Sequence, residues 1–165
     1  MADYELTRTQ GDRRVYALDG LGTLRLEGFL SRAATVEADG TTWHIAHNGF
    51  WRRRLEATDA TGATVGRFQS RTIHRGGTLR WADREFTLRP ASSWRERYAL
   101  ADGDRELAIL DGKGWGRRPV KVTVDDLDAI EPGLLLFAAF IVRGRAEDAQ
   151  SAAGAGASTA SMGGG

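Results

Sequence analysis

Short stretches of alternating apolar and polar residues follow one another from Tyr4 to Val124. In one of them, Leu24 and Leu26 alternate with Arg25 and Glu27. This period of two places the apolar side chains on one face of a β-strand. Dipeptides typical of tight turns separate the stretches, so the pattern predicts a meander of about ten to twelve antiparallel strands. The turn signals are Asp19-Gly20, Asp39-Gly40, Thr61-Gly62, Gly76-Gly77, Asp102-Gly103 and Asp111-Gly112.

The number of predicted strands bears on the shape of the sheet. A flat sheet of this many strands would leave two long edges with unpaired backbone groups, which favours closure into a barrel or a sandwich. Pro90 and Pro119 lie at the ends of alternating stretches, where a missing amide hydrogen costs little. We therefore expect a mainly β protein with a closed antiparallel sheet.

The C-terminal part breaks the alternation and predicts one helix, over about residues 131–148. Several acidic residues precede Pro132, and both features are typical of a helix N-terminus. The stretch from Leu134 to Val142 is apolar around the whole circumference of such a helix, which therefore requires burial on every side. A β-barrel closed around this helix meets the requirement, and Arg143 and Arg145 mark the point where the helix returns to water.

The chain divides into one domain, residues 1–149, and a tail, residues 150–165. From Ser151 onwards the tail contains only serine, alanine, glycine, threonine and one methionine, and this composition predicts a disordered segment. The apolar stretch Leu134–Val142 is much shorter than the roughly 20 residues that span a membrane. We therefore expect no transmembrane segment.

Composition excludes several kinds of chemistry. The chain has no cysteine, so disulfide bonds, thiolate metal sites and a cysteine nucleophile are excluded. Residues 1–10 include Asp3 and Glu5 and lack the apolar stretch of a secretion signal. The net charge is only +1, which gives no overall attraction to nucleic acid or to membranes. We expect a cytoplasmic protein, with peripheral attachment to a membrane only through a local basic patch.

Arginine is concentrated in the middle of the chain. Two segments of this region resemble each other, Trp51-Arg52-Arg53-Arg54 and Trp94-Arg95-Glu96-Arg97. An ordinary solvated surface accounts for such arginines, and recognition of phosphate groups by their guanidinium groups is the alternative. The candidate ligand-binding residues are Arg52, Arg54, Arg95, Arg97, Arg117 and Arg118.

Arg53 and Glu96 occupy equivalent positions in the two similar segments. Glu96 has the strand parity of Trp94 and Tyr98, and Arg53 has that of Trp51, so both are expected to point inward or to lie at the rim of the barrel. Paired with each other, the two charges would be satisfied. A strand end that is open to water explains them equally well.

Histidine supplies the candidate residues for an enzyme. His44 and His47 form a His-x-x-His pattern, and His74 follows farther along the chain. A zinc site needs three converging ligands, and a spacing of three within a strand places the first two poorly. Trp43 and Ile45 flank His44, which is therefore expected to face water. No serine has the glycine-flanked motif of a hydrolase nucleophile, and we expect neither a metal nor a cofactor.

Three segments follow the repeated hairpins: Gly114-Trp115-Gly116-Arg117-Arg118, the strand Val120–Val124 and the segment Ile130–Val142. Over about residues 15–148, this order of features resembles the tubby C-terminal-like superfamily, which includes the LURP-one-related proteins and the phospholipid scramblases. The resemblance implies a closed barrel around a terminal helix and binding of phosphoinositides or other anionic lipids. The cysteine cluster and the proline-rich leader of scramblases are absent from this sequence, which puts lipid scrambling in doubt.

Together these features favour a non-enzymatic binding module for an anionic lipid or another phosphorylated ligand. Two alternatives stay open. The first is an intracellular structural or protein-interaction domain that uses its tail as a tether, and the second is a hydrolase or metalloenzyme that uses His44, His47 or His74. Nucleic acid is disfavoured as a partner because the sequence has no recognised nucleic-acid-binding motif.

Overall fold

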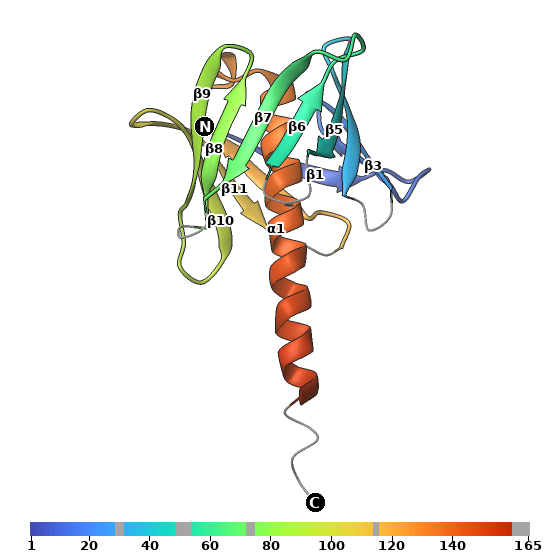
Figure 1. Ribbon diagram of the computed structural model, residues 1–165, viewed down its shortest axis with the longest axis vertical. Coiled ribbons are helices and arrows are strands. Elements are labelled where there is room, and N and C mark those ends of the chain that lie inside the picture. Colours follow the sequence, from blue (N-terminus) through green and yellow to red (C-terminus); the bar gives the residue numbers. More distant parts are fainter. Residues whose placement is uncertain (29–31, 49–53, 72–74, 114–115, 160–165) are drawn as a thin grey trace, which may run out of the picture.

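The computed structural model describes residues 1–28, 32–48, 54–71, 75–113 and 116–159. Within this part of the chain, twelve antiparallel strands form a closed barrel, and one long helix packs against it (Figure 1). The predicted mainly β class and the closed barrel are confirmed. The strands are β1 (Ala2–Arg8), β2 (Val15–Leu18), β3 (Gly22–Glu27), β4 (Ala33–Ala38), β5 (Thr41–His47), β6 (Arg54–Thr58), β7 (Thr64–Ser70), β8 (Gly77–Trp81), β9 (Arg84–Pro90), β10 (Glu96–Asp102), β11 (Arg105–Gly112) and β12 (Val120–Val124).

Each strand pairs with its neighbours in the chain, and the first and last strands close the ring. Leu6 of β1 lies opposite Leu18 of β2 on one side and opposite Val120 of β12 on the other. All three of these side chains are buried, so the seam of the barrel is part of the core. Closure leaves no sheet edge, which removes the unpaired backbone groups of an open sheet.

The interior of the barrel follows the alternation of the sequence. Leu24 and Leu26 of β3 are buried while Arg25 between them is exposed. Trp81 and Phe86 are also buried. Burial of these large side chains on one face of every strand is the main stabilising contribution to the sheet.

Helix α1 (Pro132–Thr159) supplies the centre of the core. Figure 1 shows its first half enclosed by the strands and its second half extending beyond them. Every residue from Leu134 to Val142 is buried, which confirms that this segment is enclosed by protein. The apolar circumference of the segment is explained by contact with strands on several sides of the barrel, including β3, β4, β10, β11 and β12.

The start of α1 is fixed by close aromatic packing. A Cβ atom at Gly133 would lie 2.6 Å from the Trp81 ring and 2.9 Å from the Trp43 ring, so only glycine fits between them. The Trp81 indole nitrogen also donates a hydrogen bond of 2.7 Å to the Glu131 carboxylate. The short helix η2 (Leu127–Ala129) leads the chain from β12 to this point.

The helix is longer than the sequence predicted. The prediction ended it near residue 148 and assigned residues 150–165 to a disordered tail, whereas α1 continues to Thr159. Starting a helix is the costly step, and extending one that the core already holds is much easier. Alanine, the best helix former, is frequent in this part of the chain, which favours the extension. Residues 160–165 of the predicted tail lie outside the described residues.

The two ends of the barrel differ in their connections. We call the end from which α1 emerges the helix-exit end, and the opposite end the tight-turn end. The Arg145 guanidinium donates to the Ser70 hydroxyl at 2.8 Å, and the Gln150 amide donates to the Lys113 carbonyl, both at the helix-exit end. The connections at this end are 9–14, 28–32, 48–53, 71–76, 91–95 and 113–119. Those at the tight-turn end are 19–21, 39–40, 59–63, 82–83, 103–104 and 125–131.

One predicted turn is wrong. Asp111 and Gly112 are the last two residues of β11, where Gly112 pairs with Val120 and with Glu96. The glycine is needed there because a Cβ atom would lie 2.9 Å from the Val142 side chain of α1.

In the described part of the chain, no helix combines the length and the apolar character needed to cross a membrane.

Candidate basic surface at the helix-exit end

Charge is divided between the two ends of the barrel. The connections of the tight-turn end contain nine acidic residues and no lysine or arginine. The described connection residues of the helix-exit end contain nine basic residues and one acidic residue, Asp12. The acidic residues are Asp19, Asp39, Asp59, Asp83, Asp104, Asp125, Asp126, Asp128 and Glu131. The basic residues, which we call the basic collar, are Arg13, Arg14, Arg32, Arg71, Arg75, Arg95, Lys113, Arg117 and Arg118.

The arginines proposed from the sequence as ligand contacts lie at the collar end. Arg54 is the first residue of β6, Arg97 is the second residue of β10, and Arg95, Arg117 and Arg118 belong to the collar itself. All five are exposed. Arg52 and Arg53 lie outside the described residues. The structure thus brings the described members of the set to one end of the molecule.

Several of these arginines have no charged partner. Arg118 pairs with Glu5 at 2.9 Å, and Arg54 donates a hydrogen bond of 3.3 Å to Gln69. Within the described part of the chain, Arg95 and Arg97 form no ion pair. Their guanidinium groups are therefore able to bind an external anion without first breaking an internal contact.

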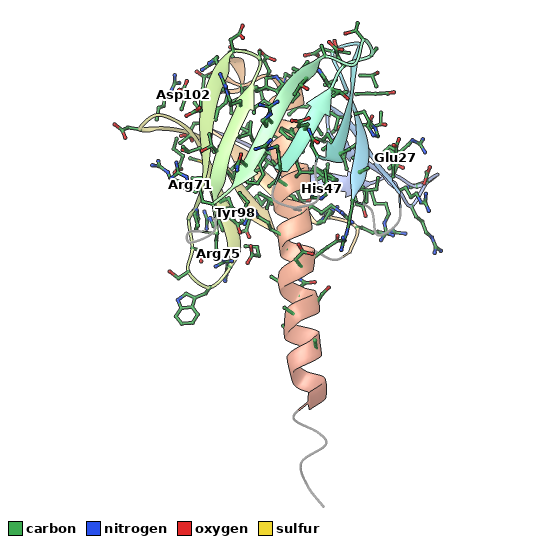
Figure 2. The ribbon with its side chains drawn as sticks, in the orientation of Figure 1. Glu27, His47, Arg71, Arg75, Tyr98 and Asp102 are labelled. Carbon is green, nitrogen blue, oxygen red and sulfur yellow. The ribbon has the colours of Figure 1, made fainter. Side chains whose placement is uncertain are left out.

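A polar network at the rim holds the emerging helix. Glu96 accepts a hydrogen bond of 2.6 Å from the Tyr98 hydroxyl and forms an ion pair with Arg75. Arg145 of α1 donates to the backbone carbonyl of Arg75 and to the hydroxyl of Ser70. Figure 2 shows Arg75 and Tyr98 together near the region where α1 leaves the barrel, while Asp102 lies toward the other end of β10. The network therefore joins the helix to strands β7 and β10.

Aromatic rings complete the environment of Arg145. Its guanidinium carbon lies 5.5 Å from the centre of the Phe68 ring and 5.6 Å from the centre of the Tyr98 ring. A cation at these distances from the ring faces is attracted by them.

Glu96 lies at the rim, where its side chain is 16% exposed, and its charged partner among the described residues is Arg75. The strand parity of Glu96 predicted a position inside or at the rim, but no pattern indicated Arg75 as its partner.

The network makes a prediction for alkaline pH. Burial and the hydrogen bond to Glu96 raise the pKa of the Tyr98 phenol in the folded state above its ordinary value. The folded state therefore binds the phenol proton more tightly than the unfolded state, and this difference stabilises the fold while the phenol is neutral. That contribution is complete below the ordinary tyrosine pKa and is lost as the pH rises through the raised value. Tyr98→Phe is expected to lower the free energy of unfolding by about 1 kcal/mol at neutral pH. The difference from wild type should narrow above about pH 10, measured by denaturant unfolding. A difference that does not change with pH would contradict this assignment.

A second arginine of α1 is more deeply buried. Arg143 is 5% exposed, donates to the Glu147 carboxylate at 2.6 Å and lies over the Tyr16 ring at 5.7 Å. No described residue forms a hydrogen bond with its Nε atom. Burial raises the pKa of Glu147 in spite of the nearby Arg143. These contacts secure the opposite side of the helix as it leaves the barrel.

The connection 91–95 carries an exposed tryptophan. Trp94 is 95% exposed, although its parity with Tyr98 had suggested an inward position. The prediction from strand parity was wrong because Trp94 precedes Glu96, the first residue of β10, and alternation applies only within the strand. No periodic signal in the sequence marks this position. The neighbouring serines and arginines are the only local indication of a polar setting.

The two histidines that the structure describes both lie on one strand. His44 and His47 are exposed on β5, and His44 lies 3.5 Å from the Glu27 carboxylate. The exposure of His44 confirms that it faces water. His74 lies outside the described residues. Among the described residues, no three histidine, cysteine, aspartate or glutamate side chains are grouped so that they would hold a metal ion.

No family model, no curated protein and no solved structure matches this chain. The tubby-like resemblance stays a prediction from the sequence. The division of charge between the two ends and the exposure of Trp94 are properties of this chain itself, and they are the basis for its proposed function.

Proposed function

We propose that the protein is a non-enzymatic binding module whose basic collar binds the phosphate groups of anionic lipids. The observation that carries the proposal is the separation of charge, with nine basic residues described in the connections of one end and nine acidic residues in those of the other. A guanidinium group matches the geometry of a phosphate group and binds it through paired hydrogen bonds.

The distribution of the collar favours an extended partner. Sites for small molecules are concave and bring a few polar groups together. The collar residues instead come from five connections around the emerging helix and are mostly exposed. A membrane surface, which presents many phosphate groups at once, fits such a spread of charge better than a single small anion.

The acidic end supports one orientation of the molecule. The net charge of the chain is only +1, so attraction to an anionic surface depends on which end approaches it. The separated charges orient the barrel with the collar toward the surface and the tight-turn end away from it. The acidic residue within the collar connections, Asp12, is paired with Arg25 at 2.7 Å.

Vesicle binding tests the proposal. The protein is expected to co-sediment with vesicles of equal parts phosphatidylcholine and phosphatidylglycerol, and not with phosphatidylcholine alone. Combining Arg95→Gln with Arg97→Gln is expected to weaken binding by about 1 kcal/mol for each arginine. Added salt should weaken it further, because the collar is exposed to solvent.

A matched variant controls for net charge. Arg84→Gln with Arg105→Gln removes the same charge from the tight-turn end, where Arg84 pairs with Asp102 and Arg105 with Asp126. These exposed ion pairs contribute little to stability, so the control should fold normally. It is expected to bind vesicles as wild type does. Equal binding to neutral and anionic vesicles, or equal losses in both double variants, would refute the proposal.

A further inference from the structure

We infer that the connection 91–95 is a membrane anchor, in which Trp94 enters the interface of an anionic bilayer and holds the barrel tilted on its surface. The inference rests on the proposed function and adds the contact that decides the depth and the orientation of binding. It follows from three features of the described residues: a preordered exposed tryptophan, the charges beside it, and the path of α1.

The exposed tryptophan is held in an ordered turn. The Ser92 hydroxyl oxygen accepts hydrogen bonds from the backbone amides of Trp94 and Arg95, at 3.3 and 3.2 Å. The Ala91 amide donates to the Arg97 carbonyl at 2.8 Å across the base of the turn. Since the backbone is already ordered, burying the indole in another phase requires little further ordering of the chain.

A neighbouring connection supports the same turn. Arg75 donates to the Ser93 carbonyl at 3.4 Å and forms the ion pair with Glu96. Arg75 in turn accepts a hydrogen bond from Arg145 of α1 at its backbone carbonyl. The turn that displays Trp94 is thus connected to the emerging helix. Glu96 is occupied by Arg75 and Tyr98 and does not oppose an anionic surface, and Asp111, which lies opposite Arg97 on β11, is outnumbered by the arginines of this region.

The charges beside Trp94 match the chemistry of a bilayer interface. Arg89 at the end of β9, Arg95, and Arg97 at the start of β10 are all exposed. Tryptophan concentrates at the level of the headgroups, where its ring is partly in apolar surroundings and its N–H is hydrogen-bonded. Arginines on either side reach the phosphate groups at the same depth. A protein partner would satisfy the tryptophan, but it would not by itself explain the surrounding excess of positive charge.

The path of α1 excludes a flat docking of the collar. The helix leaves through the centre of the helix-exit end and continues to Thr159, which is about 20 Å beyond Ala146 at 1.5 Å per residue. Docking with the helix along the membrane normal would drive Glu147 and Asp148 into the hydrocarbon layer, where charged groups are strongly disfavoured. The barrel must therefore tilt, so that one side of the collar meets the bilayer and the helix runs beside it.

The position of Trp94 selects the side that meets the bilayer. In Figure 1 the yellow-green connection between β9 and β10 lies at the lower left, and the blue connection between β1 and β2 lies on the right. When the barrel tilts toward the side that carries Trp94, the connection 91–95 faces the bilayer. Arg13 and Arg14, in the connection 9–14, then point away. Two arginine pairs at the helix-exit end, Arg95 with Arg97 and Arg13 with Arg14, are therefore predicted to contribute very differently.

The experiment uses the full chain and four variants, Trp94→Ala, Trp94→Phe, Arg95→Gln with Arg97→Gln, and Arg13→Gln with Arg14→Gln. Trp94→Ala is expected to bind vesicles of equal parts phosphatidylcholine and phosphatidylglycerol about tenfold more weakly than wild type. The alanine side chain would bury roughly 60 Å² less apolar surface in the bilayer, which corresponds to a loss of this size. Trp94→Phe should bind the same vesicles much more tightly than Trp94→Ala and nearly as tightly as wild type. The Arg95 and Arg97 variant should lose about fivefold for each arginine, and the Arg13 and Arg14 variant, which removes two collar residues on the other side, should lose clearly less.

A second measurement locates the indole. Brominated phosphatidylcholine in the same vesicles should quench part of the wild-type tryptophan fluorescence, and this quenching should disappear in Trp94→Ala. Because Trp94 is almost completely exposed, the variant is expected to keep the thermal stability of the wild type. A loss of vesicle binding therefore cannot be attributed to unfolding.

The outcomes separate this inference from the proposed function. If the Arg95 and Arg97 variant loses binding while Trp94→Ala binds and is quenched as wild type, the anchor is overturned and the lipid-binding function stands. Equal losses in the two arginine variants would overturn the tilt. If the wild type binds no anionic vesicles, the proposed function and the anchor both fail. Normal vesicle binding by Trp94→Ala with loss of a copurifying protein would assign Trp94 to a protein contact instead.

Discussion

A chain that ends at Glu131 is expected to remain unfolded. Without α1, the barrel would lose every buried residue from Leu134 to Val142, which occupy its centre. The strands would then enclose an apolar space that neither side chains nor water fill favourably. The loss of apolar burial is far larger than the net stability of a typical domain, about 5–15 kcal/mol. Circular dichroism and thermal denaturation should show no cooperative unfolding transition.

A longer truncation provides the control. A chain that ends at Gln150 keeps the whole buried segment, the contacts of Arg143 and Arg145, and the hydrogen bond from Gln150 to Lys113. Residues 151–155, which it lacks, are exposed. Its thermal midpoint should equal that of the full chain. A cooperative transition in the chain that ends at Glu131 would show that the strands form a core without the helix.

Phe137→Ala is expected to lower the free energy of unfolding by about 3–5 kcal/mol, which is the usual cost of removing a buried phenylalanine side chain. Phe137 is 0% exposed, and its ring centre lies 5.9 Å from that of Trp81. The surrounding strands are joined in a closed ring of hydrogen bonds, so the barrel cannot contract to fill the resulting cavity. Urea denaturation monitored by circular dichroism provides the measurement.

Phe137→Leu serves as the matched substitution. It keeps an apolar side chain in the cavity and should cost less than about 2 kcal/mol. An equal effect of the two substitutions would indicate that the site does not tolerate any change of shape. A loss below about 1 kcal/mol for Phe137→Ala would mean that the barrel closes around the cavity, and the enclosed position of α1 would then need revision.

The strands and the buried helix segment could be predicted because their signals are local. The alternation of Leu24, Arg25 and Leu26 fixes which side of a strand is dry, whatever strand pairs with it. The apolar circumference of Leu134–Val142 requires burial on all sides, and among mainly β folds a closed barrel supplies it. The short turns, which join neighbours, predicted only the approximate order of the strands, and the exact order came from the structure.

The wrong or incomplete predictions concern positions where tertiary contacts override local signals. Asp111-Gly112 has the composition of a turn, but Gly112 is required inside β11 by the close approach of Val142. The helix passes its predicted end because the barrel holds its first half. Trp94 has the parity of an inward residue, but it belongs to a connection and is exposed.

Residues close together in the chain were sufficient to predict the barrel, the enclosed helix segment and most of the candidate arginines. The three-dimensional arrangement was needed to show which arginines lie at the same end of the barrel and which contacts hold the emerging helix there. In a closed meander every second connection returns to the same end, so residues as distant as Arg13, Arg95 and Arg117 lie at one end of the barrel. The contacts of Arg145 with Ser70 and Arg75 likewise exist only once the ring has closed around the helix.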